Sequence, residues 1–150
     1  MDNWRTPPKI FEKLNAEFRF DLDAAADETN ALVSRYLTDA LTIPEWPGDR
    51  IFLNPPYGRM LDPFVRKSQE QATLGKTVVA LIPMRTRAAW WHEAVIGRAM
   101  EVRCIRKRPK FLRPNRSIPK YTLSCDSAII IWKGVGLPMG TILTSFDYGG

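Results

Sequence analysis

Residues 51–57 read Ile-Phe-Leu-Asn-Pro-Pro-Tyr, an apolar run that leads directly into an amide, two prolines and an aromatic ring. The apolar run predicts a short buried strand, Arg50 to Leu53. Asn54 precedes a proline, which keeps its backbone extended, and Pro55 and Pro56 have no N–H to donate. A proline-rich turn is the alternative for such residues. Because they directly follow a strand, they favour a ligand-binding loop at the carboxyl end of that strand in an open α/β sheet.

The tetrad Asn54, Pro55, Pro56 and Tyr57 has the groups needed to activate a planar amine. The exocyclic amine of adenine is a poor nucleophile because its lone pair is delocalised into the ring. The Asn54 side chain and the Pro55 carbonyl can accept its two protons and localise that lone pair, while Tyr57 offers a flat face for stacking. The nitrogen can then attack an activated methyl group in line. Preorganised dipoles and positioning carry this chemistry, so no strongly basic side chain is required.

Composition bounds the class of protein. A chain of 150 residues with 45% hydrophobic residues suits one globular domain with a real core and excludes a disordered protein. No apolar stretch approaches the ~20 residues that span a membrane, and no signal-peptide pattern is present. Cys104 and Cys125 lack metal-ligand spacing and are expected to be reduced. With His92 as the single histidine, we expect no metal site. The sequence does not indicate an oligomeric state.

Charge is unevenly distributed along the chain, whose net charge is +6. Residues 1–30 hold seven acidic and four basic residues, whereas residues 103–120 hold eight basic residues and no acidic one. The acidic part suits a cationic ligand and the basic part a polyanion. A solvated surface is the usual explanation for a run of charge. Phe111 within this run, followed by Arg113 and Arg116, favours contact with nucleic acid instead.

The rest of the pattern alternates strands and helices. We expect a helix with Thr6 as N-cap, a strand over 18–23, loop and helix over 24–36, a helix from Leu61 to Gly75, a strand buried on both faces over 77–82, a helix over 86–96, and strands over 102–105 and 128–132. This order predicts an α/β fold in a single domain, residues 1–150, with a doubly wound parallel sheet and a β-rich C-terminal part. At least one of Trp90 and Trp91 should lie in the core, and the other could be partly exposed.

From Trp4 to about Trp132, an ordered set of segments resembles the small phage- and prophage-encoded Dam-type DNA adenine methyltransferases. The segments are 4–7 (Trp-Arg-Thr-Pro), 20–26 (Phe-Asp-Leu-Asp-Ala-Ala-Ala), 36–41 with Trp46, 52–58 around the tetrad, 81–92, and 108–111 (Arg-Pro-Lys-Phe). Each segment is short, but the ordered set is specific. The resemblance implies a compact Rossmann-like methyltransferase sheet with flanking helices and S-adenosylmethionine as cofactor, and it makes the tetrad the catalytic motif.

The resemblance also implies residues that bind the cofactor. They are Trp4, Thr6, Asp23 and Asp39, with Thr6 on the cofactor's carboxylate, Asp23 on its methionine amine or ribose, and Asp39 on its adenine amine. Because the cofactor carries a sulfonium and an amino group, both positive, acidic residues at strand ends suit it. A capping role is the open alternative for both aspartates.

The implied macromolecular partner is DNA, with no membrane and no metal, in the cytoplasm of the host cell if the chain is phage-encoded. Phosphate contacts would dock the duplex, and the target adenine would flip out of the stack between Tyr57 and Phe111. A core position is the alternative for Phe111. The residues expected at the DNA are Lys107, Arg108, Lys110, Phe111, Arg113 and Arg116.

Two features depart from the pattern of such enzymes. The segment Asp23 to Asp27 has no glycine, which removes the positive φ of a usual cofactor loop. Only 30 residues separate Asp23 from Leu53, which leaves little space for the usual two intervening strands. The missing glycines support one alternative, a non-catalytic nucleic-acid-binding protein on a decayed methyltransferase fold. Methylation of RNA adenine or of a protein glutamine is a further alternative, because the Asn-Pro-Pro-Tyr motif also occurs in enzymes of those classes. The basic segment disfavours the glutamine substrate, and the intact tetrad argues against decay.

Overall fold

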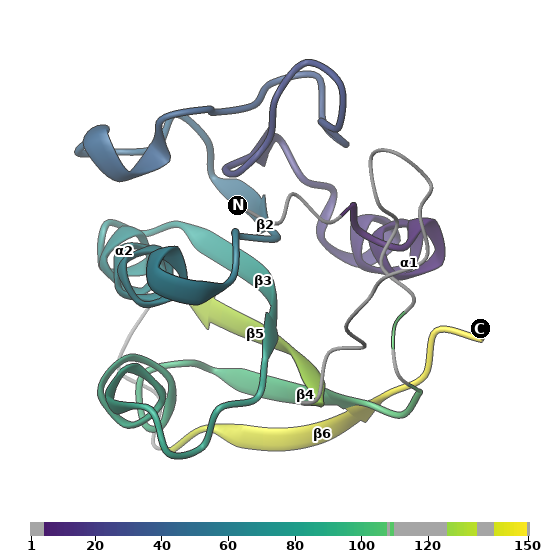
Figure 1. Ribbon diagram of the computed structural model, residues 1–150, viewed down its shortest axis with the longest axis vertical. Helices are drawn as coiled ribbons and strands as arrows, with labels where there is room; N and C mark the ends of the chain where they lie inside the picture. The colour runs from purple at the N-terminus through teal and green to yellow at the C-terminus, as the bar shows by residue number, and fades with distance from the viewer. Residues whose placement is uncertain (1–4, 108, 110–125, 135–139, 150) are drawn as a thin grey trace.

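Figure 1 shows the computed structural model, which describes residues 5–107, 109, 126–134 and 140–149. One sheet contains six strands: β1 (Leu22–Asp23), β2 (Arg50–Leu53), β3 (Thr77–Pro83), β4 (Glu101–Ile105), β5 (Ser127–Lys133) and β6 (Ile142–Phe146). The helices are α1 (Pro8–Phe18), α2 (Leu61–Thr73), the 3₁₀ helices η1 (Ala40–Thr42) and η2 (Gly58–Met60), and the π-helical η3 (Trp91–Val95). The predicted α/β class is confirmed.

The strands lie in the order β1-β2-β3-β5-β4-β6. β1, β2 and β3 are parallel neighbours, β5 is antiparallel to both β3 and β4, and β6 is parallel to β4. The prediction of a parallel sheet is therefore wrong for β5, because a buried strand has the same apolar pattern in either direction. The ends of β1, β2, β3, β4 and β6 share one edge of the sheet, here called the carboxyl edge. The opposite edge is called the amino edge.

Both faces of the sheet are covered, as the alternation in β3 shows. Val78, Ala80 and Ile82 join the larger core cluster, to which α2 contributes Leu61, Phe64 and Val65. Val79 and Leu81 join the smaller cluster, to which α1 contributes Ile10 and Leu14. Figure 1 shows α2 on one side of the sheet and α1 on the other. The prediction of a strand buried on both faces is confirmed. No helix in the described part of the chain is long and apolar enough to cross a membrane.

Several predicted element ends were wrong. Pro7, not Thr6, occupies the N-cap of α1, and it makes no side-chain cap bond. The predicted strand over 18–23 is only Leu22–Asp23, because α1 continues to Phe18 and Arg19 then turns the chain with a left-handed φ of 54°. The helix expected over 24–36 is absent, and turns and bends occupy that segment. β6 was not specifically predicted, because only Phe146 of its five residues is buried.

The helix expected over 86–96 begins at residue 89 and winds as η3 from Trp91. Trp90 and Trp91 are both buried, with ring centroids 5.9 Å apart and an interplanar angle of 70°. The expectation that at least one of them lies in the core is confirmed, and the second is buried as well, because both rings enter the larger core cluster and pack edge to face. His92 is exposed.

The segment between β1 and β2 contains no strand of the sheet, as its length predicted. β1 pairs directly with β2, and an isolated parallel bridge joins Asp23 to Tyr36 on the other side of β1. The rest of the segment is attached to α2 through Gln71, which is fully buried. Its Oε1 accepts from the Trp46 N–H at 2.7 Å, and its Nε2 donates to the Pro44 carbonyl at 2.9 Å. One glutamine side chain therefore satisfies two main-chain groups that have no partner strand in the sheet.

We expect Gln71→Met to lower the free energy of unfolding by about 1–3 kcal/mol, because a side chain of similar shape would leave a buried N–H and a carbonyl unsatisfied. Chemical denaturation measures this loss. Gln69→Met, at a partly exposed position on the same helix, is the matched control. Equal stability of the two variants would contradict the role of Gln71.

Candidate active site

The tetrad leaves β2 at the carboxyl edge, in the position that the sequence predicted. Asn54 follows Leu53, the last residue of β2, and its side chain is half-buried. Asn54 Nδ2 donates to Thr6 Oγ1 at 2.9 Å. Thr6 is buried, with 6% of its surface exposed. The Thr6 hydroxyl, which was expected to cap a helix, instead accepts a hydrogen bond from the Asn54 side chain. In this orientation Nδ2 of the amide faces Thr6, and Oδ1 is the atom that can accept from a substrate.

The prolines and the tyrosine form the rest of this loop. Pro55 is buried and Pro56 is half-buried. Among the described residues no main-chain N–H donates to the Pro55 carbonyl. Tyr57 is half-buried and packs against the larger core cluster together with Met60. Gly58 then has a φ of +86°, so the chain turns into η2 through a conformation that favours glycine.

Asp23 ends β1, next to β2 on the same edge. Its register partner is Phe52, and Ala24 N–H continues the pairing by donating to the Phe52 carbonyl at 3.0 Å. The carboxylate accepts from the N–H groups of Ala25 at 3.3 Å and Leu32 at 3.2 Å. The aspartate therefore caps the turn that follows it, which is one of the two roles left open by the sequence.

Asp23 is also a buried charge, with 3% of its surface exposed. Burial raises the pKa of Asp23 from 3.8 to about 6, although the hydrogen bonds from Leu32 and Ala25 lower it. Among the described residues no lysine, arginine or histidine forms an ion pair with it. A buried carboxylate in this state is stabilised by a positively charged ligand.

The glycine-free loop after β1 closes without left-handed backbone. Arg19 is the only residue other than glycine with a positive φ in the described part of the chain, so 24–27 need no such geometry. Asp27 closes the turn, because its carboxylate accepts from the Thr29 N–H, the Thr29 hydroxyl and the Asn30 N–H. These bonds, with the Thr29 hydroxyl contributing most, lower the pKa of Asp27. Carboxylate caps thus replace glycine in this loop.

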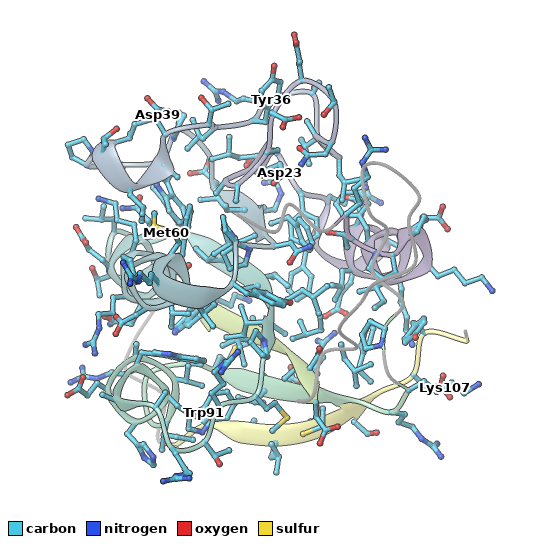
Figure 2. The ribbon with its side chains drawn as sticks, viewed as in Figure 1. Asp23, Tyr36, Asp39, Met60, Trp91 and Lys107 are labelled. Carbon is cyan, nitrogen blue, oxygen red and sulfur yellow. The ribbon has the colours of Figure 1, made fainter. Side chains whose placement is uncertain are left out.

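Asp39 lies on the same side of the molecule as Asp23. The bridge from Tyr36 to Asp23 is parallel, so the chain through Leu37 runs beside β1 toward the carboxyl edge. Figure 2 shows Asp23, Tyr36 and Asp39 in the same upper region, and Lys107 well away from them. Asp39 precedes η1, is exposed, and makes no side-chain cap bond. The capping role considered for Asp39 is therefore not seen.

The basic segment is less uniform than its sequence suggested. Arg103 forms a bidentate pair with Glu17, both bonds 2.7 Å, and a further bond of 3.0 Å to Glu101. The hydrogen bonds to Glu17, ahead of those to Glu101, raise the pKa of Arg103. Arg103 thus ties α1 to β4 and is occupied inside the protein. Lys107 is exposed at the end of β4.

Several predicted site residues lie outside the described residues. They are Trp4, Arg108, Lys110, Phe111, Arg113 and Arg116. The described flanks of residues 108–125 both lie at the carboxyl edge, because β4 ends there and β5 begins there. The Met84 N–H, directly after β3, donates to the carbonyl of Asp126 at 2.7 Å. The described residues contain no cluster of three or more potential metal ligands.

Sequence reasoning missed two features of the site. The bond from Asn54 to Thr6 joins positions 48 residues apart, and no local pattern signals it. Three exposed arginines, Arg59, Arg85 and Arg87, follow the ends of β2 and β3 and were not considered as site residues. Their signal in the sequence is a basic residue shortly after β2 and two shortly after β3, two strands that end at the carboxyl edge.

Comparison with known proteins decides the family. Residues 1–147 match the family described as DNA N-6-adenine-methyltransferase (Dam). The chain belongs to the Dam family. One relative, the "DNA N-6-adenine-methyltransferase" of Escherichia phage T1, is 35% identical over 97 residues, which cover 62% of this chain and 40% of the relative. The protein of the same name from Haemophilus phage HP1 is 36% identical over 100 residues, which cover 63% of this chain and 57% of that protein. The matched segments thus span about half the length of these two relatives.

We expect the stability of the protein to depend on pH through Asp23. Because its folded pKa is raised, ionisation costs folding free energy: the cost is absent below pH ~4 and complete above pH ~7. Asp23→Asn removes this cost, so the stability of the variant relative to wild type should rise by about 2–3 kcal/mol between those pH values. Denaturation at several pH values measures the difference, with the exposed Asp39→Asn as control for the loss of a carboxylate. If the difference in unfolding free energy between Asp23→Asn and wild type stayed constant with pH, Asp23 would not be a buried charge.

Proposed function

We propose that this chain transfers a methyl group from S-adenosylmethionine to the exocyclic amino group of adenine in DNA. The observation that carries the proposal is the Asn54 amide, held by Thr6 at the carboxyl edge, one strand away from the buried carboxylate of Asp23. These two groups suit the two reactants, an amine that must be bound by acceptors and a cofactor that is positively charged. The names of the Dam-family relatives from phages T1 and HP1 support the same reaction.

We infer that residues 1–150 form one Rossmann-like methyltransferase domain. The neighbouring parallel strands β1, β2 and β3 support this inference, as do the helices on both faces of the sheet. The candidate site lies outside the carboxyl ends of these strands, where open α/β sheets bind ligands. In this compact form, β1 is next to β2, and among the residues that the structure describes only the Tyr36 bridge lies beyond it.

The residues at β1 fit S-adenosylmethionine in their chemistry. Asp23 is a buried carboxylate with no described ion-pair partner, and Asp39 is an exposed carboxylate further along the chain that runs beside β1. Asp23 would hold a positive or hydroxyl-bearing part of the cofactor, and Asp39 its adenine amine. When bound, the cofactor supplies a methyl group on a positively charged sulfur.

The tetrad prepares the amine for attack. Asn54 Oδ1 and the Pro55 carbonyl accept the two N–H groups of the adenine amine, which draws its lone pair out of the ring. Tyr57 positions the base by stacking, after the nucleotide has left the duplex. Thr6 acts as a positioning residue, because its bond to Nδ2 keeps Oδ1 directed at the substrate. The proton displaced from the amine is lost to water.

DNA is the substrate best supported by the distribution of charge. Asp23 and Asp39 lie on the β1 side of the site. Asp27 follows β1 by four residues, directly after Ala26, whose N–H donates to the Leu37 carbonyl. The described flanks of the basic segment lie at the ends of β4 and β5, at the same edge but beyond β3. A polyanion is therefore attracted to one side of the tetrad and a cationic cofactor to the other.

The substrate is tested by incubating the purified chain with methyl-labelled S-adenosylmethionine and DNA, RNA or a protein extract. We expect label in DNA, recovered as N6-methyladenine after digestion to nucleosides. Asn54→Ala should reduce the rate at least about 100-fold, by loss of one preorganised dipole. Undiminished methylation by Asn54→Ala would refute the mechanism, and label confined to RNA or protein would refute the substrate.

The role of Thr6 is tested by removing only its hydroxyl. We expect Thr6→Val to lower kcat about 10-fold or more while the KM for the cofactor changes little, because the amide loses its fixed orientation. Thr6→Ser should recover most of the rate. A rise confined to the cofactor's KM would instead assign Thr6 to the cofactor's carboxylate. Thr73→Val, at an exposed position on α2, is the matched control.

Testing Thr6→Val in a protein that also carries Asn54→Asp separates an effect on the orientation of residue 54 from an effect on the stability of the protein. In Asn54→Asp both side-chain oxygens are acceptors, so either orientation presents an acceptor to the amine. Thr6→Val should therefore cost less than about 3-fold in this background, against about 10-fold beside Asn54. Equal losses in the two backgrounds would show that Thr6 does not act by orienting the amide.

A further inference from the structure

We propose that Arg59, Arg85 and Arg87 form a phosphate-binding surface that holds the DNA backbone next to the tetrad. This surface is hereafter called the arginine surface. The inference rests on the proposed function, because it takes DNA as the substrate. It assigns the contact to residues outside the basic segment 103–120, which was the only part of the sequence expected to bind DNA.

The three arginines follow two adjacent strands at the carboxyl edge. Arg59 lies in η2, directly after the tetrad, and Arg85 and Arg87 follow β3. β2 and β3 are parallel neighbours, with Leu53 opposite Ala80, so both loops leave the sheet on the same edge. Tyr57 and Met60 of one loop, and Met84 and Ala88 of the other, pack against the same core cluster. The loops that carry the arginines therefore begin side by side, at the ends of two adjacent strands.

The charges on this surface are available to a ligand. All three arginines are exposed. Within the described ranges, no carboxylate forms an ion pair with any of them. Other arginines of the chain are occupied: Arg66 binds Asp62 and Glu93, each at 2.6 Å, and Arg103 binds Glu17 and Glu101. The protein thus uses some arginines as internal ties and leaves three exposed ones beside the tetrad.

The chemistry of the surface fits a nucleic-acid backbone. Guanidinium groups bind phosphate oxygens in a bidentate manner and stay charged at any physiological pH. A base that enters the tetrad must bring its flanking phosphates to the same edge of the sheet. Contacts to those phosphates would fix the position of the strand without reading its sequence. The arginine surface would therefore set affinity for DNA, whereas the tetrad carries the chemistry.

The test compares two triple variants with the same change in charge. Arg59, Arg85 and Arg87 are replaced by Gln in the first, and Arg19, Arg98 and Lys133 in the second. The control residues are also exposed and lie toward the amino edge, where Arg19 ends α1, Arg98 precedes β4 and Lys133 ends β5. Binding of each protein to a fluorescent DNA duplex is measured by anisotropy from about 50 to 200 mM salt, the range over which phosphate contacts show their salt dependence.

For wild type we expect affinity to fall steeply with salt. The first triple variant should lose about 2 to 3 units of the slope of log affinity against log salt, and the control less than about 1 unit. In methylation assays, the first triple variant should raise the KM for DNA and largely keep kcat. Equal slopes for the two triple variants would overturn the arginine surface.

The methylation assay separates this inference from the proposed function. If wild type methylates adenine in DNA while the two triple variants bind alike, the surface is refuted and the function stands. If wild type neither binds nor methylates DNA, both are refuted. Thermal melting of all three proteins shows whether the substitutions leave the fold intact, and single Arg→Gln variants replace the triple variant if it does not fold.

Discussion

The direct pairing of β1 with β2 is the constraint on which the site depends. Leu22 pairs with Ile51 and Asp23 with Phe52, so the two strands that carry the Asp23 carboxylate and the Asn54 amide are adjacent, about 4.8 Å between backbones. Asn54 lies two residues beyond the register partner of Asp23. Further strands between β1 and β2 in the sequence would lie beyond β1 in the sheet, so they would not alter the pairing of β1 with β2. The short segment 24–49 can therefore stand in their place. Gln71 and the carboxylate caps of Asp23 and Asp27 then satisfy the main-chain groups of that segment.

Charge divides the carboxyl edge into two regions with the tetrad between them. Aspartates gather around β1, and exposed arginines follow β2 and β3. The arginine that the sequence placed at the start of the basic run, Arg103, is instead paired with two glutamates and ties α1 to β4. The distribution of charge along the sequence therefore indicated a polyanionic partner. Ion pairs between residues distant in the sequence decide which basic side chains are exposed and can bind that partner.

The sequence predicted the parts of the fold that local pattern encodes. The apolar runs of β2, β3 and β5 and the apolar face of α2 were found at or near their observed bounds, because burial imposes their periodicity. The direction of β5, the π winding of η3 and the exposed strand β6 were not predictable, because none of them has a distinct local pattern. The tetrad could be recognised from four consecutive residues. Its partner Thr6 could not, because the bond to Asn54 depends on where α1 packs.

The central claim is that Asn54, held by Thr6, receives the amine of a flipped adenine. A crystal structure of this chain with a DNA duplex and a non-reactive analogue of the cofactor tests it most directly. The account predicts Asn54 Oδ1 and the Pro55 carbonyl each about 3 Å from the adenine N6, with Nδ2 still bound to Thr6. An adenine bound away from the tetrad, or an Asn54 amide that has released Thr6 to bind the base, would contradict it.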